Sequence, residues 1–326
     1  MSGALLLRAV ANLMLLTVTS NATIDRTLHI PHLTIGEVHR ATSVHLAAGG
    51  KGLNVTRAAR ILGCDVLATG PLAGHAGRLM ADLAVAEGIR ADWHWLPSGE
   101  TRTCTLVNHD QGDTTVLNEP GEPLTEADWA RFAAHVEKLA VHAQAVAFSG
   151  SLPPRVAPAA LSALARSLAT AERPVYLDTS LAALRAALAQ PTGLCLKVNR
   201  AELAEAWGEA GVDFSTDKII AVGQKLLEKG AALVVVTLGG AGALAVTPAG
   251  VWQAGVPSVE VVSTVGSGDS FLAGLAVARL RGYTIEDALA YGIACGAANA
   301  TTRLPARFER GMVEALVKQV NVKRDA

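Results

Sequence analysis

The chain has 326 residues, of which half are hydrophobic and only 17% are charged. This composition excludes an intrinsically disordered chain, because that class is poor in apolar residues and rich in charge. The 28 Lys and Arg residues are offset by 29 Asp and Glu residues, which leaves a formal net charge of −1 and no basic excess for binding nucleic acid or an anionic membrane surface.

The N-terminal segment is apolar but irregular. Arg8 and Asn12 interrupt the run over residues 1–16, so it is too short and too broken for a transmembrane helix and makes a poor signal peptide. We interpret residues 1–13 as an N-terminal extension, with a first strand at about 13–19. The four cysteines form no CxxC motif, which favours buried thiols in a reducing, cytoplasmic setting.

The first third of the chain mixes two textures. Apolar spacing predicts helices over residues 52–62 and 78–87, with a short buried strand at 66–69 between them. Residues 27–46 and 99–118 are instead rich in β-branched residues, and the second stretch carries a hairpin signal at DQGD. These strands stand apart from the helix–strand alternation, so they predict a small sheet that projects from the main body.

From residue 126 onward, strands and helices alternate regularly. This order predicts an α/β fold with a mostly parallel sheet covered by helices on both faces, and residues 14–326 are expected to form one domain. The predicted helices are 126–141, 158–170, 201–207, 216–229, 269–281, 285–300 and 311–319. The predicted strands are 145–149, 175–178, 194–198 and 232–237, followed by a hairpin of 243–247 and 251–254. Residues 318–325 are expected to be a frayed tail.

The segment STVGSGD, residues 263–269, precedes an apolar helical stretch and carries the clearest chemical signal. Glycines at a helix start let backbone N–H groups approach an anion, and the helix dipole adds positive potential. Asp269 could then take the proton of an attacking hydroxyl, while the amides of Ser267, Gly268 and Asp269 hold the phosphoryl group. An Asp that merely caps a helix after a glycine turn explains the isolated motif about as well.

A second glycine-rich loop, GGKGLN, covers residues 49–54. Gly50 and Asn54 could hold sugar hydroxyls, and Lys51 could meet a phosphate. The loop is not a P-loop, because no G-x-x-x-x-G-K-[ST] is present. An exposed turn with one lysine is the alternative.

Two more loops follow predicted strands. In KVNRAE, residues 197–202, Asn199 and Glu202 have the spacing of a helix capping box, while a functional interpretation makes Glu202 the organiser of a hydrated Mg2+ near nucleotide phosphates. In VVTLGGAG, residues 235–242, an apolar strand enters glycines that could lie against the phosphate and ribose of ATP.

Together the four loops occur in the order and approximate spacing of the ribokinase-type (PfkB) carbohydrate kinases, and the sequence resembles that family from about residue 14 to residue 319. STVGSGDSFLAG resembles the family signature, AAGGKGLN the sugar-binding signature, KVNRAE the N-x-x-E motif and VVTLGGAGA the nucleotide loop. Further matches are NATID at 21–25, TR at 101–102, LNEPG at 117–121 and SGSLPP at 149–154. This set resembles the branch of 1-phosphofructokinase and tagatose-6-phosphate kinase, which acts on phosphorylated hexoses.

The resemblance implies a ribokinase-like three-layer α/β sandwich whose small sheet, from about 27–46 and 99–118, forms a lid. It implies Asp269 as general base, with Gly266, Ser267 and Gly268 as the anion hole. The residues implied for the sugar are Asp25, Gly50, Lys51, Asn54, Arg102 and Ser151, of which Lys51 and Arg102 would contact the phosphate already on the substrate. The residues implied for ATP are Lys197, Asn199, Glu202, Thr237, Gly239, Gly242 and Asn299, and Glu202 would hold Mg2+ through water.

The implied activity is ATP-dependent phosphorylation of a hydroxyl on a phosphorylated hexose, with fructose 1-phosphate converted to fructose 1,6-bisphosphate as first choice. Tagatose 6-phosphate and fructose 6-phosphate are alternative acceptors. A non-catalytic sugar- or nucleotide-binding regulator is the alternative of another class, although binding alone needs no base. The resemblance also implies a homodimer that forms through the lid.

Two segments depart from the family pattern. The loop over residues 299–308 lacks the glycine that often helps to frame the adenine and a monovalent-cation site, so K+ is a doubtful cofactor. The family's NPA-type opening is Asn21-Ala22-Thr23 here, without the proline, and the loop before Asp25 is therefore expected to lie differently.

Overall fold

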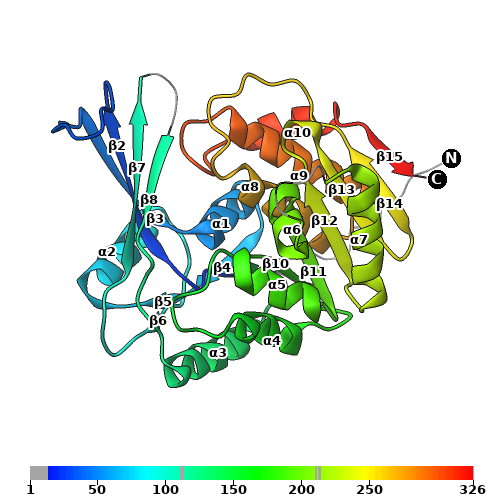
Figure 1. Cartoon of the computed structure of the whole chain (residues 1–326), viewed down its shortest axis with the longest axis horizontal. Coiled ribbons are helices and arrows are strands. Elements are labelled where there is room, and N and C mark those ends of the chain that lie inside the picture. The colour runs from blue at the N-terminus through cyan, green and yellow to red at the C-terminus, as the bar shows by residue number, and fades with distance from the viewer. Residues whose placement is uncertain (1–13, 111–113, 210, 212–213, 326) are drawn as a thin grey trace.

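The computed structural model describes residues 14–110, 114–209, 211 and 214–325. The predicted N-terminal extension and the tip of the predicted hairpin at 111–113 lie outside these residues. The described chain forms a large sheet between two layers of helices, with a smaller sheet standing to one side (Figure 1).

The large sheet has nine strands. The six from β4 to β12 are parallel, and the last three pair antiparallel at one edge. Buried Val, Leu and Ala fill the parallel strands, as expected for a sheet covered on both faces. In spatial order the strands are β15 (Val322–Asp325), β14 (Gly250–Ala254), β13 (Ala243–Thr247), β12 (Leu233–Thr237), β11 (Leu194–Asn199), β10 (Val175–Asp178), β9 (Ala145–Ser149), β1 (Met14–Val18) and β4 (Asp65–Thr69).

Helices cover both faces, so the predicted three-layer α/β sandwich is confirmed. Alternate strand residues point to opposite layers: Leu16 and Val18 join one core cluster and Leu15 joins the other. The first layer contains α3 (Glu126–Ala140), α4 (Pro158–Leu168), α5 (Leu181–Ala189), α6 (Arg200–Trp207) and α7 (Thr216–Glu228). The second contains α1 (Lys51–Ile61), α8 (Ser267–Leu280), α9 (Ile285–Ala300) and α10 (Arg310–Val317).

The smaller sheet is the one predicted to project, and Figure 1 shows it beside the main body. Its order is β3 (Ser43–Gly49), β2 (Thr23–Ile30), β7 (Arg102–His109) and β8 (Thr114–Asn118). Helix α2 (Gly74–Ala86) packs against β2 and β3, and a short pair, β5 (Pro71–Leu72) and β6 (His94–Trp95), lies nearby. The strands β2 and β3 extend further toward the main body than the sequence predicted.

The remaining elements agree with the sequence only in part. The predicted hairpin of 243–247 and 251–254 is present, since Val246 pairs with Val251 in an antiparallel register. Helix α5 had no counterpart among the predicted helices. The predicted frayed tail is wrong for its final residues, because β15 pairs with β14 and extends the large sheet.

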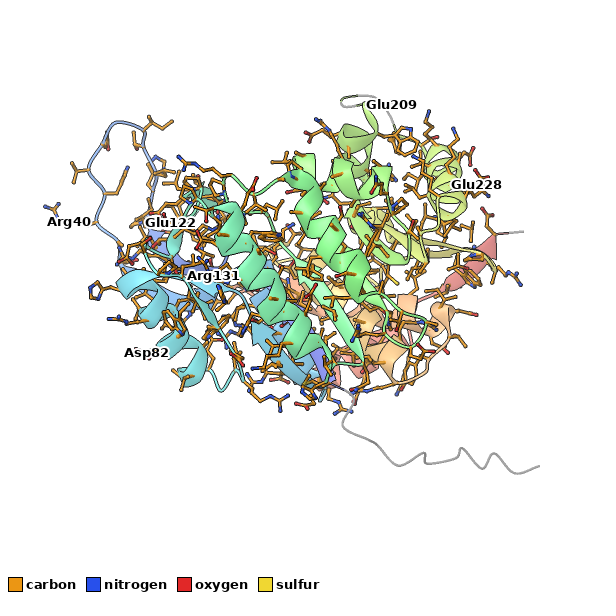
Figure 2. All side chains as sticks on the ribbon, turned by 90° about the horizontal axis from the view of Figure 1, so that it is seen from below. Arg40, Asp82, Glu122, Arg131, Glu209 and Glu228 are labelled. Atoms are coloured by element: carbon orange, nitrogen blue, oxygen red, sulfur yellow. The ribbon has the colours of Figure 1, made fainter. Side chains whose placement is uncertain are left out.

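Charged side chains of both signs lie on the surface. Figure 2 shows Asp82 on α2, Arg131 on α3 and Glu228 on α7 pointing outward. Within the described part of the chain, no helix has the length and apolar character to cross a membrane.

Candidate active site

Asp269 occupies the third position of α8, and its side chain is buried. Gly266 precedes the helix at φ +81°, in the left-handed region that glycine adopts readily. The Ser267 N–H donates to the Thr264 carbonyl at 3.1 Å, which corrects the prediction that this amide faces an anion. The amides of Gly268 and Asp269 are therefore the first-turn donors that this helix end can offer.

Burial is the main cause that raises the pKa of Asp269 to about 6, and the nearby Asp178 raises it further. The ammonium groups of Lys51 and Lys197 oppose this rise, as does a hydrogen bond from the Asn54 amide, whose Nδ2 donates to Asp269 Oδ2 at 2.9 Å. A carboxylate in this setting is ionised at neutral pH, yet it is basic enough to accept a proton from a hydroxyl.

Two cavities near Asp269 share Lys51 in their walls. One, of about 590 Å³, lies between the small sheet and the main body, and Lys51 and Asn54 are in its wall. The other, of about 430 Å³, contains Asp269 and again Lys51. Lys51 thus lines both cavities, and Asp269 of the second cavity is hydrogen-bonded to Asn54 of the first.

The first cavity brings together the complete set of residues predicted for the sugar. The members of that set in its wall are Asp25, Gly50, Lys51, Asn54, Arg102 and Ser151. They come from β2, the start of α1, β7 and the loop after β9. The small sheet therefore supplies two of the predicted ligands directly, since Asp25 and Arg102 lie on neighbouring parallel strands.

Asp25 is held at the wall of this cavity by a close backbone. A Cβ added at Gly49 would lie 2.2 Å from Asp25 Oδ1, so glycine there makes room for the carboxylate. Burial raises the pKa of Asp25 to about 6, against the opposing charges of Arg57 and Arg102. Gly49 belongs to the GGKGLN loop noted in the sequence, but it had no predicted role of its own.

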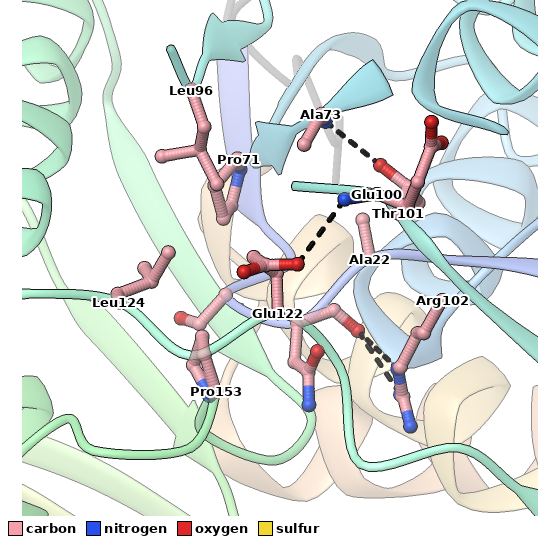
Figure 3. A pocket seen from close by; sticks show the side chains of 12 residues that line it. Ala22, Pro71, Ala73, Leu96, Glu100, Thr101, Arg102, Glu122, Leu124 and Pro153 are labelled. Carbon is pink, nitrogen blue, oxygen red and sulfur yellow. Dashed lines mark hydrogen bonds between the residues drawn. The ribbon is translucent and has the colours of Figure 1, made fainter. Parts of the chain in front are cut away.

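Arg102 is held by backbone carbonyls. Its Nε and Nη2 donate to the Asn21 carbonyl at 3.2 and 3.0 Å (Figure 3), and its Nη1 donates to the Glu119 carbonyl at 3.0 Å. A guanidinium has five N–H donors, so these bonds fix its position and leave two for an anion. The small cavity of Figure 3, about 20 Å³, is too small for a hexose.

Ser151 is linked to the segment that replaces the family's NPA opening. The Asn21 side chain donates to Ser151 Oγ at 3.3 Å and to the Pro120 carbonyl at 3.1 Å. Asn21 therefore ties the loop after β1 to the loop after β9. Asp25 lines the sugar cavity even though this segment lacks the family's proline.

The second cavity contains nearly all the residues predicted for ATP. Those in its wall are Lys197, Asn199, Glu202, Thr237, Gly239 and Gly242, together with Gly266, Ser267 and Gly268 from the start of α8. Apolar side chains such as Val256, Val259 and Ile293 line the rest, and such a surface suits a planar base. Asn299 is the exception.

Asn299 is fully buried outside the wall of this cavity, which corrects its predicted contact with the nucleotide. Its Nδ2 donates to the Val265 carbonyl at 2.8 Å and to Ser267 Oγ at 3.0 Å, while its Oδ1 accepts from the Ala306 N–H at 2.6 Å. The side chain spends its hydrogen-bonding capacity on the loops beside α8. It supports the shape of the glycine-rich turn and does not face the cavity.

Asp178 is a residue that the sequence analysis missed. It is fully buried at the end of β10, where its Oδ2 accepts from Lys197 Nζ at 2.7 Å. Lys51 Nζ lies 3.8 Å from its Oδ1, and the carboxylate is the main cause of the raised pKa of Lys51. One carboxylate thus holds the two ammonium groups on either side of Asp269. Its position at the carboxyl end of a predicted parallel strand is a signal that could have found it.

Glu202 makes the capping-box bonds that the sequence predicted and keeps its other carboxylate oxygen toward Lys51. Its Oε2 accepts from the Asn199 N–H at 3.0 Å, and the Asn199 side chain caps α6 in return. The other oxygen lies 3.9 Å from Lys51 Nζ. Among the described residues, no group of three or more His, Cys, Asp or Glu side chains could hold a metal. A Mg2+ that keeps its waters and binds phosphates needs only one or two carboxylates, so Glu202 fits that ion.

The comparisons with known proteins agree with this geometry. The family model for pfkB family carbohydrate kinases matches residues 15–308. Phosphofructokinase-2 of Escherichia coli, in a structure with potassium, is 26% identical, with a TM-score of 0.87 and coverage of 94% of this chain and 99% of that one. A protein titled a possible 1-phosphofructokinase from Thermotoga maritima is 23% identical, with a TM-score of 0.81 and coverage of 96% and 100%. Ribokinase from the same organism is 22% identical, with a TM-score of 0.70 and coverage of 94% and 99%.

These findings confirm the resemblance drawn from the four loops, and they show that this chain is an ATP-dependent sugar kinase. A match that spans residues 15–308 includes both cavities and the helix that carries Asp269. The chain belongs to the pfkB family of carbohydrate kinases.

Proposed function

We propose that this chain transfers the terminal phosphoryl group of ATP to a hydroxyl of a phosphorylated hexose, with Asp269 as the general base. The observation that carries the proposal is the position of Asp269 at the start of α8, in the wall of one cavity and hydrogen-bonded to Asn54 in the wall of the other. The hexose would occupy the cavity next to the small sheet, and the nucleotide would occupy the other.

The chemistry follows from the groups around Asp269. Asp269 accepts the proton of the attacking hydroxyl while the hydroxyl oxygen bonds to the terminal phosphorus of ATP; the bond from that phosphorus to the bridging oxygen breaks, and ADP leaves with the bridging oxygen. The amides of Gly268 and Asp269 face the charge that gathers on the transferring group, and the helix dipole adds to this stabilisation. Lys51 and Lys197, held by Asp178, supply positive charge from two sides.

Mg2+, bound with the nucleotide, would neutralise phosphate charge. On this chain, Glu202 is the residue that would hold it through water, with the oxygen that faces Lys51. K+ has less support from the chain's own loop over residues 299–308, although a potassium complex is known for the phosphofructokinase-2 relative. A K+ titration at constant ionic strength measures this dependence directly.

Lys51 and Arg102 favour an acceptor that already carries a phosphate, since both line the sugar cavity and Arg102 retains donors for an anion. Fructose 1-phosphate is our first choice because of the resemblance to the 1-phosphofructokinase branch. Fructose 6-phosphate is the second, because the phosphofructokinase-2 of Escherichia coli, 26% identical, is known in complex with it. Tagatose 6-phosphate is a further alternative.

A coupled assay for ADP over fructose 1-phosphate, fructose 6-phosphate, tagatose 6-phosphate, fructose and ribose tests the proposal. We expect the highest kcat/KM for a phosphorylated hexose, with fructose 1-phosphate first. A preference for fructose or ribose would refute the role given to Lys51 and Arg102. Binding of sugar and nucleotide without any turnover would favour the non-catalytic regulator instead.

We also propose that residues 14–326 act as one domain and that two copies pair through the small sheet. Val44 on β3 and Leu117 on β8 are about 56% and 59% exposed, which is unusual for large apolar side chains on strands. Leu117→Asp should lower the molar mass measured by light scattering from that of a dimer to that of a monomer. An unchanged mass would refute pairing through this sheet.

We further propose a cytoplasmic location for this kinase, and cell fractionation checks it.

A further inference from the structure

Arg57 lies in the middle of α1, one helical turn beyond Asn54, and is only 4% exposed. It is absent from the walls of both cavities around Asp269. An arginine this deeply buried must have its charge and its donors satisfied, because an unpaired charge in the interior is costly. Its partners show what the residue does.

The guanidinium joins three separate segments. Its Nε and Nη2 donate to the two carboxylate oxygens of Glu87, at 2.6 and 2.9 Å, just beyond the end of α2. Its Nη2 also donates to the Ala48 carbonyl at the end of β3. Its Nη1 donates to Asn54 Oδ1 at 3.0 Å.

The last bond determines which way the Asn54 amide faces. With Oδ1 held by a cationic donor, Nδ2 is left to donate to Asp269 Oδ2. The opposite orientation would set the amide oxygen against the carboxylate and the amide nitrogen against the guanidinium, and both pairings would repel. The Arg57 guanidinium and the Asp269 carboxylate therefore favour the same orientation, and the bond from Arg57 holds the amide oxygen in place.

We propose that Arg57 is a positioning residue of the kinase reaction: it fixes the Asn54 amide so that this amide holds one oxygen of Asp269 and leaves the other for the acceptor hydroxyl. This proposal rests on the proposed function, in which Asp269 is the base. Glu87 fixes the guanidinium in turn, and Arg307 Nη2 contacts the same carboxylate at 2.9 Å. The chain of contacts runs from the loop that follows α9 to the base.

The Arg57→Lys variant tests this role because it keeps the positive charge. Lysine cannot bond Glu87 and Asn54 together in the fork geometry of a guanidinium. We expect kcat to fall by about 10²-fold, since a small misplacement of a reacting group has an effect of that size. The KM for the sugar phosphate should change little, because the charge near Asp25 is kept.

A double-mutant cycle separates positioning from a merely structural role. In the Asn54→Ala background, Arg57→Lys should change kcat by less than about 2-fold, because the amide it orients is gone. An equal loss of kcat in both backgrounds would overturn the proposal. Arg60→Met is the matched control: Arg60 lies on the same helix and donates to the Glu87 carbonyl at 2.9 Å, without reaching Asn54. Its kcat should stay near that of the parent.

The pH dependence of kcat gives a second test, because a loss of folded protein lowers the rate without changing the pH at which the rate falls. The charged groups that face Asp269 are Lys51 from α1, Asp178 from β10 and Lys197 from β11, and all of them remain in the variant. Loss of the Asn54 hydrogen bond should move the acid limb of the kcat profile to higher pH. A lower kcat with an unmoved limb would also count against the proposal.

Glu87→Gln keeps the test decisive if Arg57→Lys does not fold. It weakens the hold on the guanidinium while leaving Arg57 in place, and it should show the same non-additivity with Asn54→Ala and the same direction of the pH limb. Additive losses there would overturn the proposal equally. Failure of the proposed function is distinguishable, because it appears as full activity in Asp269→Asn, whatever the outcome at Arg57.

Discussion

Replacement of Asp269 by asparagine should lower activity and raise stability together. Asparagine has the same shape, and its Oδ1 can still accept from the Asn54 amide that now bonds the carboxylate at 2.9 Å. The variant therefore keeps its local geometry and loses only the ability to take a proton. A positioned base contributes about 10²–10⁴-fold to the rate, so kcat should fall by that factor.

The gain in stability follows from the pKa of the same carboxyl group. Burial raises this pKa from 3.8 to about 6, and a rise of roughly 2 corresponds to about 3 kcal/mol. The folded pKa is above the unfolded one, so this cost is fully expressed above pH 6 and is relieved as the pH falls toward 4. Asparagine removes it. For a chain of 326 residues, about 3 kcal/mol corresponds to a rise in Tm of about 4 °C at pH 8.

The assay measures ADP release and thermal unfolding on the same preparation at pH 8 and at pH 5. Asp287→Asn is the matched control, since Asp287 also occupies the third position of a helix and accepts a hydrogen bond from the Thr284 hydroxyl at an exposed site. It should keep both rate and Tm. The reasoning about a buried base would be wrong if Asp269→Asn retained near-parental turnover. It would also be wrong if the Tm of the variant were below that of the parent by the same amount at pH 8 and at pH 5.

The other predictions concern sugar, metal, backbone and pH. Arg102→Met should raise the KM for the sugar phosphate about 10–100-fold, because a charged hydrogen bond is lost, and leave the KM for ATP unchanged; equal changes in both would contradict the separation of the cavities. Glu202→Gln should raise the Mg2+ concentration for half-maximal rate about 10-fold, with an unchanged Tm because glutamine also completes a capping box. Gly242→Ala should lower stability by about 2 kcal/mol or more, because φ is +104° and the new Cβ would lie 1.8 Å from the Ala254 carbonyl oxygen, whereas Gly240→Ala meets nothing within 4 Å and should be neutral in a urea melt. The kcat should fall as the pH drops through about 6, where Asp269 becomes protonated; a flat profile from pH 8 to 5 would argue against this base.

Local patterns predicted the large sheet and most of its helices because the alternation from residue 126 onward is regular. They failed where pairing with a distant strand decides the structure. The polar residues of Val322–Asp325 give no strand signal, and only their pairing with β14 makes them a strand. Likewise β2 and β3 extend beyond the predicted lid boundaries because Thr23 pairs with Gly49, although glycine is unfavourable in strands.

The site shows the same division. Motif residues such as Lys51, Asn54 and Asp269 could be predicted, because glycines and polar groups at strand–helix junctions have a recognisable pattern. Asp178 stands at a strand end, which is a sequence signal, but its importance became visible only in the structure, which brings it to Lys51 at the start of α1 and Lys197 on β11. Asn299 shows the opposite error: a polar residue near the nucleotide loop was assigned a contact, but its side chain bonds the backbone and serine hydroxyls around the start of α8 instead.

The shared lysine makes the two cavities interdependent. An anion that draws the ammonium of Lys51 into one cavity withdraws it from Asp178 and Glu202 and changes the field in the other. Whatever factor the nucleotide imposes on sugar affinity, the sugar must impose on nucleotide affinity in return. A coupling of this kind would act through a single side chain that lines both cavities.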